Sequence, residues 1–277
     1  MYAACSAKLY LVISLDGKCM SLEDGPIGRA QELLANMRAG SQSAVEAFSS
    51  QVPALASLAE HGNLVAQEML GGYYLEYASN PALAFQYFRL AATAGSAAAQ
   101  RAIGHMIMNG IGFDPDPAKA AELFAGAARA GDAIAQYNLG QMYMRGVGVE
   151  PDAEAASQFL ESAARGGVPA AWAALAELHE ANEETAIARG LLSKGAEAGD
   201  PKAIKRFANF LRDGVGGERD AVQSVRWYLR LLDFGDGDGV HEAIGLARSM
   251  TDAEVLRAAE LAGRPSDGQT LLQVVRK

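Results

Sequence analysis

The chain has 277 residues, of which half are hydrophobic, and its 24 Lys and Arg against 33 Asp and Glu give a formal net charge of −9. Such an apolar composition excludes a fully disordered chain, and the acidic balance argues against a nucleic-acid-binding platform, which is normally basic. Alanine contributes 55 residues. Because alanine is the best helix former, this excess predicts an all-helical protein with closely packed helices.

Residues 1–20 differ from the rest and form an N-terminal segment for which no structure is predicted. Their apolar run Leu9–Leu15 has no basic region before it and no small-x-small site after it, so it does not resemble a secretory signal. The only cysteines, Cys5 and Cys19, cannot supply a disulfide framework, and no apolar run reaches the roughly 18 residues of a membrane span. We therefore expect a cytoplasmic protein, with Met20 as a candidate start.

Residues 21–61 are predicted to form a degenerate N-terminal capping repeat. Ala30-Gln31 lies 36 residues before Ala66-Gln67, in phase with the repeats that follow. Ser21–Asp24 would open the first helix of this unit, and Pro53 would interrupt the second. Terminal units of a repeat array are expected to be atypical, because one of their faces meets water.

Residues 62–235 contain five repeats. Each repeat opens with a glycine that follows an Ala-rich helix end, and a small residue and an apolar residue follow four and eight positions later. Positions +4, +8 and +12, counted from the opening glycine, form one stripe on a helix. This spacing therefore predicts a first helix, which we call helix A. The opening glycines define repeats 62–94, 95–130, 131–166, 167–198 and 199–235.

A second helix, helix B, is predicted in every repeat from a polar residue fifteen positions before the next repeat's glycine. These residues are expected to be N-caps, since short polar side chains accept the free N–H groups of a first helical turn, and the closing glycine suits the left-handed position after a helix. Gly-x-Gly loops join the two helices in three repeats, whereas the shorter first and fourth repeats lack one. The predicted caps are Asn80, Asp116, Asp152, Glu184 and Asp220.

Residues 236–277 are predicted to form C-terminal capping helices and a tail. Val240–Arg248 and Thr251–Leu261 have the pattern of two short helices. Thr251 would cap the second of these, with Glu254 completing a capping box.

The repeat pattern resembles the Sel1-like repeat family, a relative of the tetratricopeptide helical hairpins. The resemblance rests on the Ala-Gln and Leu-Gly pairs of helix A, the Gly-x-Gly loops, the Ala-Ala-x-x-Gly endings, and the Asp116, Lys119 and Ala120 pattern. The fourth repeat departs from it, with His179 in place of the helix A tyrosine that other repeats have at Tyr74 and Tyr143. The resemblance implies an all-α fold, a right-handed superhelical solenoid of helical hairpins.

No motif in the sequence indicates catalysis or a cofactor. The Gly-x-Gly loops follow helices, whereas a dinucleotide fingerprint follows a strand. Asp233, Asp236 and Asp238 lack the spacing of a calcium-binding loop, and the four histidines contain no His-x-x-x-His pair for zinc. We therefore predict no enzyme activity, no cofactor and no metal.

A candidate partner-binding surface follows from helix geometry. If positions +4, +8 and +12 of helix A face the core, positions +6, +10 and +13 face away from it. The resemblance implies that this side lines a concave groove. An alternative is that these side chains are merely solvated, and that Met106, Met108, Met142 and Met144 fill gaps in an alanine-rich core. The candidate residues are Glu68, Arg101, His105, Met108, Tyr137, Gln141, Met144, Glu177, Glu180, Lys205, Asn209 and Arg212.

The resemblance implies a non-enzymatic protein–protein interaction module, a bacterial scaffold, adaptor or regulator that binds a protein or peptide on its concave surface. The negative charge suits a basic partner and disfavours nucleic acid. One alternative is an immunity or inhibitor protein that neutralises a specific toxin or effector. A second alternative is an enzyme-associated domain.

Overall fold

The computed structural model describes residues 12–13, 19–20 and 25–277. The short strands β1 (Val12–Ile13) and β2 (Cys19–Met20) pair antiparallel. The predicted helix start at Ser21–Asp24 lies outside the described residues. Within them, the first helix has Gly25 as its N-cap and Pro26 as its first residue.

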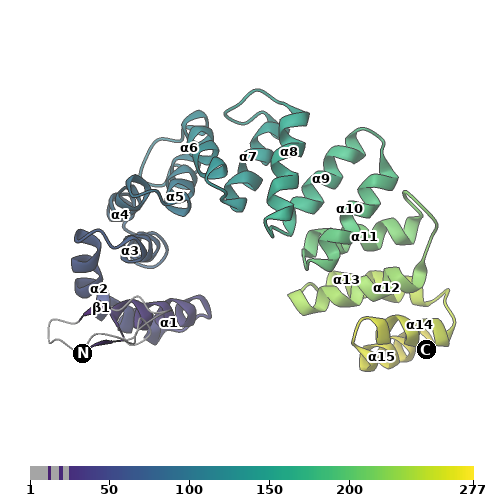
Figure 1. Cartoon of the computed structure of the whole chain (residues 1–277). Helices are drawn as coiled ribbons and strands as arrows, with labels where there is room; N and C mark the ends of the chain where they lie inside the picture. The colour runs from purple at the N-terminus through teal and green to yellow at the C-terminus, as the bar shows by residue number, and fades with distance from the viewer. Residues whose placement is uncertain (1–11, 14–18, 21–24) are drawn as a thin grey trace, which may run out of the picture. The chain divides into compact units, whose positions relative to one another are not determined.

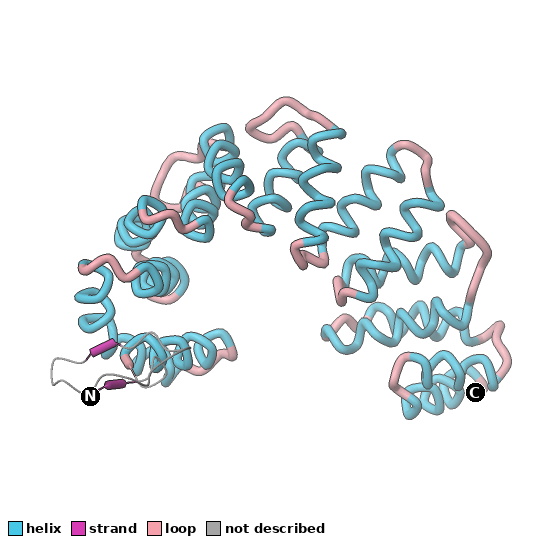
Figure 2. The backbone as a smooth tube through the Cα atoms, viewed as in Figure 1, coloured by secondary structure: helices cyan, strands magenta, loops and turns pink. Residues whose placement is uncertain are grey.

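Fifteen α-helices make up most of the described chain (Figures 1 and 2). None of them is long and apolar enough to cross a membrane. In chain order they are α1 (Pro26–Arg38), α2 (Gln42–Glu60), α3 (Leu64–Glu76), α4 (Pro81–Thr93), α5 (Ala97–Met108), α6 (Pro117–Arg129), α7 (Ala133–Arg145), α8 (Ala153–Arg165), α9 (Ala170–Ala181), α10 (Thr185–Glu197), α11 (Pro201–Asp213), α12 (Ala221–Arg230), α13 (Asp238–Ala247), α14 (Asp252–Leu261) and α15 (Pro265–Val275).

The helices divide into two compact units, Met1–Ala130 and Gly131–Lys277, which we call unit 1 and unit 2. In each unit, consecutive helices pack as hairpins, and each hairpin packs against the next. This is the all-helical solenoid that the repeat pattern predicts. Helix A of the five repeats is α3, α5, α7, α9 and α11, and helix B is α4, α6, α8, α10 and α12.

The alanines lie where helices approach one another. The alanine four positions after each opening glycine is fully buried, as is the alanine four positions after the cap in four of the five B helices. A small side chain at these sites lets two backbones come close, which explains why the sequence needs so many of them. The buried alanines are Ala66, Ala99, Ala135, Ala171 and Ala203 of helix A, and Ala84, Ala120, Ala156 and Ala188 of helix B.

Four of the five predicted N-caps are confirmed. The side chains of Asn80, Asp116, Asp152 and Asp220 each accept a hydrogen bond from the backbone N–H three residues later, over 2.9–3.1 Å. The closing glycines adopt the predicted left-handed conformation, with φ between 73° and 95°.

Glu184 is the exception among the predicted caps. It makes no capping bond, and its carboxylate instead lies 2.6 Å from Nδ1 of His179 on the preceding helix. Its side chain is one methylene longer than that of aspartate, so it reaches past its own helix terminus. Glu183, with φ of 63°, supplies the left-handed turn that a glycine would make. The α9–α10 hairpin therefore forms without a Gly-x-Gly loop.

Pro53 does not interrupt a helix, which corrects the sequence prediction. Helix α2 runs through it from Gln42 to Glu60. Pro53 is exposed, while Phe48 and Leu55 of the same helix are fully buried. Burying each of these side chains contributes about 1.5–3 kcal/mol, which offsets the cost of about 3 kcal/mol for a proline inside a helix.

The C-terminal region contains one helix more than predicted. Helices α13 and α14 lie where two helices are expected, and Thr251 and Glu254 form the predicted capping box. The region assigned as a tail contains α15, whose Leu271 is buried in the core of unit 2. A Cβ on Gly268 would lie 2.6 Å from Cβ of Ala259, so α15 packs on α14 at a distance that only glycine allows.

Candidate functional site

The predicted surface, which we call the A-helix face, consists of the candidate residues of α3, α5, α7, α9 and α11. In unit 1, Glu68 accepts a hydrogen bond of 2.5 Å from the hydroxyl of Ser96. Ser96 is itself the N-cap of α5, so Glu68 connects two successive A helices. Of the α5 candidates, His105 is exposed, whereas Arg101 and Met108 are half-buried.

On α7 of unit 2, Tyr137, Gln141 and Met144 are all half-buried. Tyr137 packs against the core between α8 and α9, and burial raises the pKa of its hydroxyl. The amide oxygen of Gln141 is buried and has no hydrogen-bond partner among the described residues.

The four methionines differ in their burial. Met106 and Met142 are buried and fill the core, as the alternative explanation requires. Met108 and Met144 are partly exposed, so they remain available for contact with a partner.

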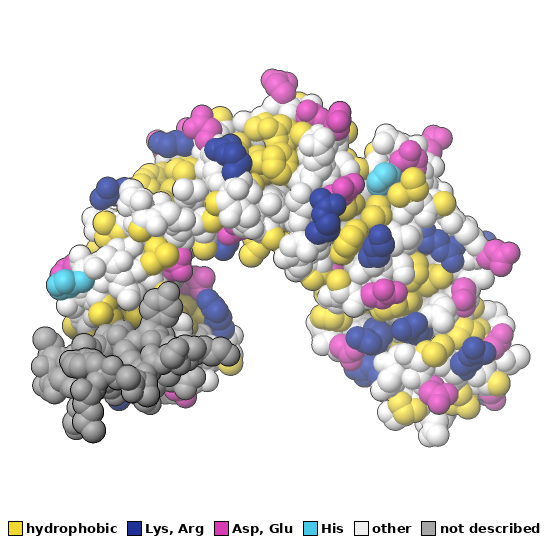
Figure 3. Space-filling view, in the orientation of Figure 1, with side chains coloured by type: hydrophobic (Ala, Val, Ile, Leu, Met, Phe, Trp, Pro, Cys, Tyr) yellow, Lys and Arg dark blue, Asp and Glu magenta, His cyan; other side chains and the backbone are white. Residues whose placement is uncertain are grey.

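Most charged candidates of α9 and α11 pair with neighbouring helices. Glu177 lies 3.7 Å from the ammonium of Lys202, and Glu180 pairs with Arg206, so α9 is connected to α11. Lys205 reaches the carboxylate of Asp238 at 3.1 Å, which connects α11 to α13 and raises the pKa of the lysine. Figure 3 shows basic and acidic side chains interspersed over the visible side of unit 2.

Asn209 and Arg212 of α11 belong to a further polar network. The hydroxyl of Tyr228 donates to Asn209 over 2.5 Å and accepts from Arg212 over 3.2 Å. Arg212 also contacts Asp213 at 2.8 Å and Glu242 at 2.7 Å, and its guanidinium lowers the pKa of Asp213. The charged candidates of α11 therefore hold helices together, which sequence spacing did not reveal.

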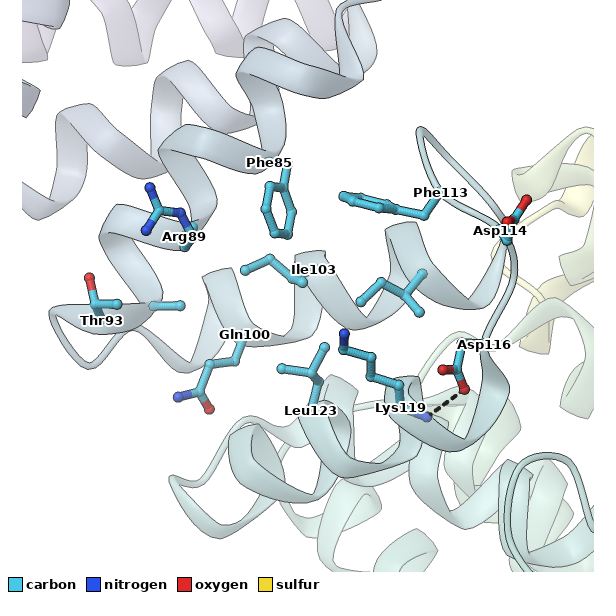
Figure 4. A pocket seen from close by; sticks show the side chains of 12 residues that line it. Phe85, Arg89, Thr93, Gln100, Ile103, Phe113, Asp114, Asp116, Lys119 and Leu123 are labelled. Carbon is cyan, nitrogen blue, oxygen red and sulfur yellow. Dashed lines mark hydrogen bonds between the residues drawn. The ribbon is translucent and has the colours of Figure 1, made fainter.

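A groove that sequence reasoning missed lies within unit 1, on the side of the B helices. It has a volume of about 570 Å³. We call it the α4–α6 groove. Its lining includes Phe85 and Arg89 of α4, Gln100, Ile103 and Ile107 of α5, Phe113 of the loop before α6, and Lys119 and Leu123 of α6 (Figure 4).

The Gly-x-Gly loop builds one wall of this groove. Gly112 has φ of +80°, and a Cβ on it would lie 3.0 Å from Cβ of Pro81, so the loop sits directly on the first turn of α4. Phe113 then packs edge-on against Phe85, with 4.8 Å between the ring centroids. The two rings are 28 positions apart in the chain, and the signal that could have found them is an aromatic residue directly after a Gly-x-Gly loop.

Comparison with known proteins agrees with the repeat pattern. The model of the Sel1 repeat matches residues 64–96, 97–132, 133–168 and 202–233. It leaves out α9 and α10, the hairpin of the fourth repeat. No curated protein matches the chain in sequence.

The solved structures that share the fold include two with TM-scores above 0.6. One is a protective antigen present in uropathogenic Escherichia coli strains, which displays an SLR fold; the TM-score is 0.64 at 24% identity, over 81% of this chain and 56% of that protein. The present chain thus spans little more than half the length of that antigen. The other is a Sel1 repeat protein from Oxalobacter formigenes, with a TM-score of 0.62 at 20% identity, over 90% of this chain and 97% of the other. With four matched repeats and this fold, the chain belongs to the Sel1 repeat family.

Proposed function

We propose that the chain is a non-enzymatic interaction module, a bacterial scaffold, adaptor or regulator that binds a segment of a partner protein on the part of its A-helix face that lies in unit 2. Sel1 and tetratricopeptide repeats are generally protein-interaction modules. The observation that carries the proposal is the row formed by Tyr137, Gln141 and Met144 on α7, which are partly exposed and follow one another at helical spacing.

This row suits an extended peptide for chemical reasons. The aromatic ring and the thioether offer adaptable apolar contact. The amide of Gln141, whose oxygen lacks a partner among the described residues, can turn to bond a peptide backbone. By contrast, Glu180, Lys205 and Arg212 already pair with side chains of their own unit. The proposed contact is therefore centred on α7, and the net charge of −9 favours a partner with a basic surface.

Site-specific photo-cross-linking in the organism that encodes the chain tests this proposal. Benzoylphenylalanine replaces Met144 in one variant of the full chain and Gln158, an exposed residue of α8, in a matched control. Mass spectrometry of the cross-linked products then identifies the partner. We expect one protein to be captured through position 144 and not through position 158. Equal capture at both positions, or capture only at 158, would show that the A-helix face is not the binding surface.

A second variant, Tyr137→Ala with Met144→Ala, separates binding from folding. We expect it to weaken the captured complex while its helical circular dichroism stays near that of the parent. Loss of helicity would instead show that these side chains belong to the core.

A further inference from the structure

The α4–α6 groove has an apolar floor and an open top. Ile103 and Ile107, only 6% and 5% exposed, form its floor. Phe85 and Leu123 are half-buried, and Phe113 is 39% exposed. In Figure 4 the two phenylalanine rings lie on one side of Ile103, and Leu123 lies on the other. A volume of about 570 Å³ is within the range of roughly 300–1,000 Å³ of sites that enclose ligand groups.

The charged groups around this floor are two cations, Arg89 and Lys119, and two carboxylates, Asp114 and Asp116. Neither the guanidinium of Arg89 nor the ammonium of Lys119 has a hydrogen-bond or ion-pair partner in the described part of the chain, and Lys119 extends from α6 toward α5 (Figure 4). Asp116 is occupied as the cap of α6, where it accepts from the backbone N–H of Lys119 over 3.0 Å. Asp114 lies at the far end of the groove, beside Phe113 (Figure 4).

Gln100 adds a third donor. Its amide oxygen is buried without a partner among the described residues, and it faces Gly126, where a Cβ would lie 3.1 Å from that oxygen. The amide nitrogen is left on the side of the groove near Thr93 (Figure 4). Arg89, Gln100 and Lys119 thus offer N–H groups around an apolar floor.

From this arrangement we infer that the α4–α6 groove docks a segment of a partner protein in which a large apolar side chain is flanked by aspartate or glutamate. The apolar side chain packs on Ile103 between Phe85 and Leu123, and the carboxylates pair with Arg89 and Lys119. Charge complementarity selects this occupant, because the side chains of Arg89 and Lys119 have no partner among the described residues, whereas Asp116 is engaged as the cap of α6. The groove is separate from the A-helix face and does not depend on the function proposed for that face.

Selection from a random-peptide phage library on the immobilised full chain tests the inference. The best selected peptide is synthesised with a fluorescent label, and its affinity is measured by fluorescence anisotropy. We expect the selected peptides to share an apolar residue next to Asp or Glu. No enrichment over a surface without protein, or enrichment of basic peptides, would overturn the proposal.

Variants then locate the bound peptide. Phe85→Ala, and separately Arg89→Glu with Lys119→Glu, should each weaken binding at least tenfold. Arg129→Glu, an exposed position of α6 outside the groove, is the matched control and should leave the affinity unchanged. The charge variant changes only exposed side chains, so it stays informative if Phe85→Ala fails to fold.

A third comparison separates this proposal from the one for the A-helix face. Tyr137→Ala with Met144→Ala should leave the affinity for the selected peptide unchanged. If that variant abolishes binding while the groove variants do not, the peptide binds the A-helix face and the groove proposal is wrong.

Discussion

Units 1 and 2 have different side chains at equivalent positions of helix B and of the Gly-x-Gly loop in the next repeat. Phe85 of α4 and Arg189 of α10 both lie five positions after the residue that precedes helix B. Phe113 and Gly217 both lie three positions after the first glycine of a Gly-x-Gly loop. In unit 1 the two rings pack edge-on. In unit 2 the guanidinium of Arg189 donates to the carbonyl oxygens of Val215 at 3.4 Å and Glu218 at 2.9 Å.

The side chains beneath these positions also differ in how fully they are buried. Leu123 of α6 is half-buried beside the open groove, whereas its counterpart Trp227 is 5% exposed and packs against Phe207, with 5.9 Å between the ring centroids. Unit 2 therefore fills with its own side chains a space that unit 1 leaves open. The two units share the backbone of the repeat. A few side chains on helix B and on the Gly-x-Gly loop of the next repeat determine whether a groove remains.

The largest expected effect on stability is that of replacing a glycine in the Gly-x-Gly loop of unit 2. Gly216 has φ of +68°, and a Cβ on it would lie 2.3 Å from the carbonyl oxygen of Thr185. An alanine in the left-handed conformation costs about 1–2 kcal/mol, and a clash with backbone adds about 1–3 kcal/mol. Gly216→Ala should therefore lower the free energy of unfolding by about 3–4 kcal/mol in urea titrations followed by circular dichroism.

Gly112→Ala is the matched change in unit 1. A Cβ there would meet only the ring carbons of Pro81, at 3.0 Å and beyond, so the conformational cost of about 1–2 kcal/mol dominates. Equal losses for the two variants would mean that the loop of unit 2 does not sit closer to its helix than that of unit 1.

A smaller effect is expected for Arg189→Ala. It removes the two hydrogen bonds from a charged donor to the loop carbonyls, and such bonds contribute about 1.5–3 kcal/mol when well formed. Because one of them is long, at 3.4 Å, we expect a loss of about 1–2 kcal/mol. Hydrogen exchange measured by mass spectrometry should show faster exchange of residues 214–219 and no change at 110–115. Unchanged exchange at 214–219 would show that Arg189 does not hold the loop.

The smallest effect depends on pH. Arg212 lowers the pKa of Asp213 below its usual 3.8, so the ionised carboxylate stabilises the fold above that value, and the gain is lost as the pH falls through the lowered pKa. Asp213 is half exposed, so the contribution should stay below about 1 kcal/mol. Urea titrations at pH 5.5 and pH 3 should show that Asp213→Asn is less sensitive to acid than the parent. Equal acid sensitivity of the variant and the parent would show that Asp213 does not contribute to the pH dependence of stability.

Sequence spacing predicts much of the fold, because repeated positions identify buried faces and caps. Asp116 and Gly131 could be placed correctly, since a cap and a left-handed glycine depend on local backbone geometry. Pro53 and α15 could not, because burial of Phe48 and Leu271 decides these helices and burial is a tertiary property. Likewise, the spacing selects the face of α11 but not the partners of Arg212, and it gives no sign that Phe85 meets Phe113.

The most direct test of the open groove introduces into unit 1 the two residue types that occupy the equivalent positions in unit 2. In the double variant Phe85→Arg with Phe113→Gly, the new guanidinium would lie near the carbonyls of Ile111 and Asp114, the counterparts of Val215 and Glu218. Anisotropy titrations with the selected acidic–apolar peptide compare this variant with the parent. We predict at least a tenfold loss of affinity with helicity retained. Unchanged affinity in a folded double variant would contradict the claim that this groove is the docking site.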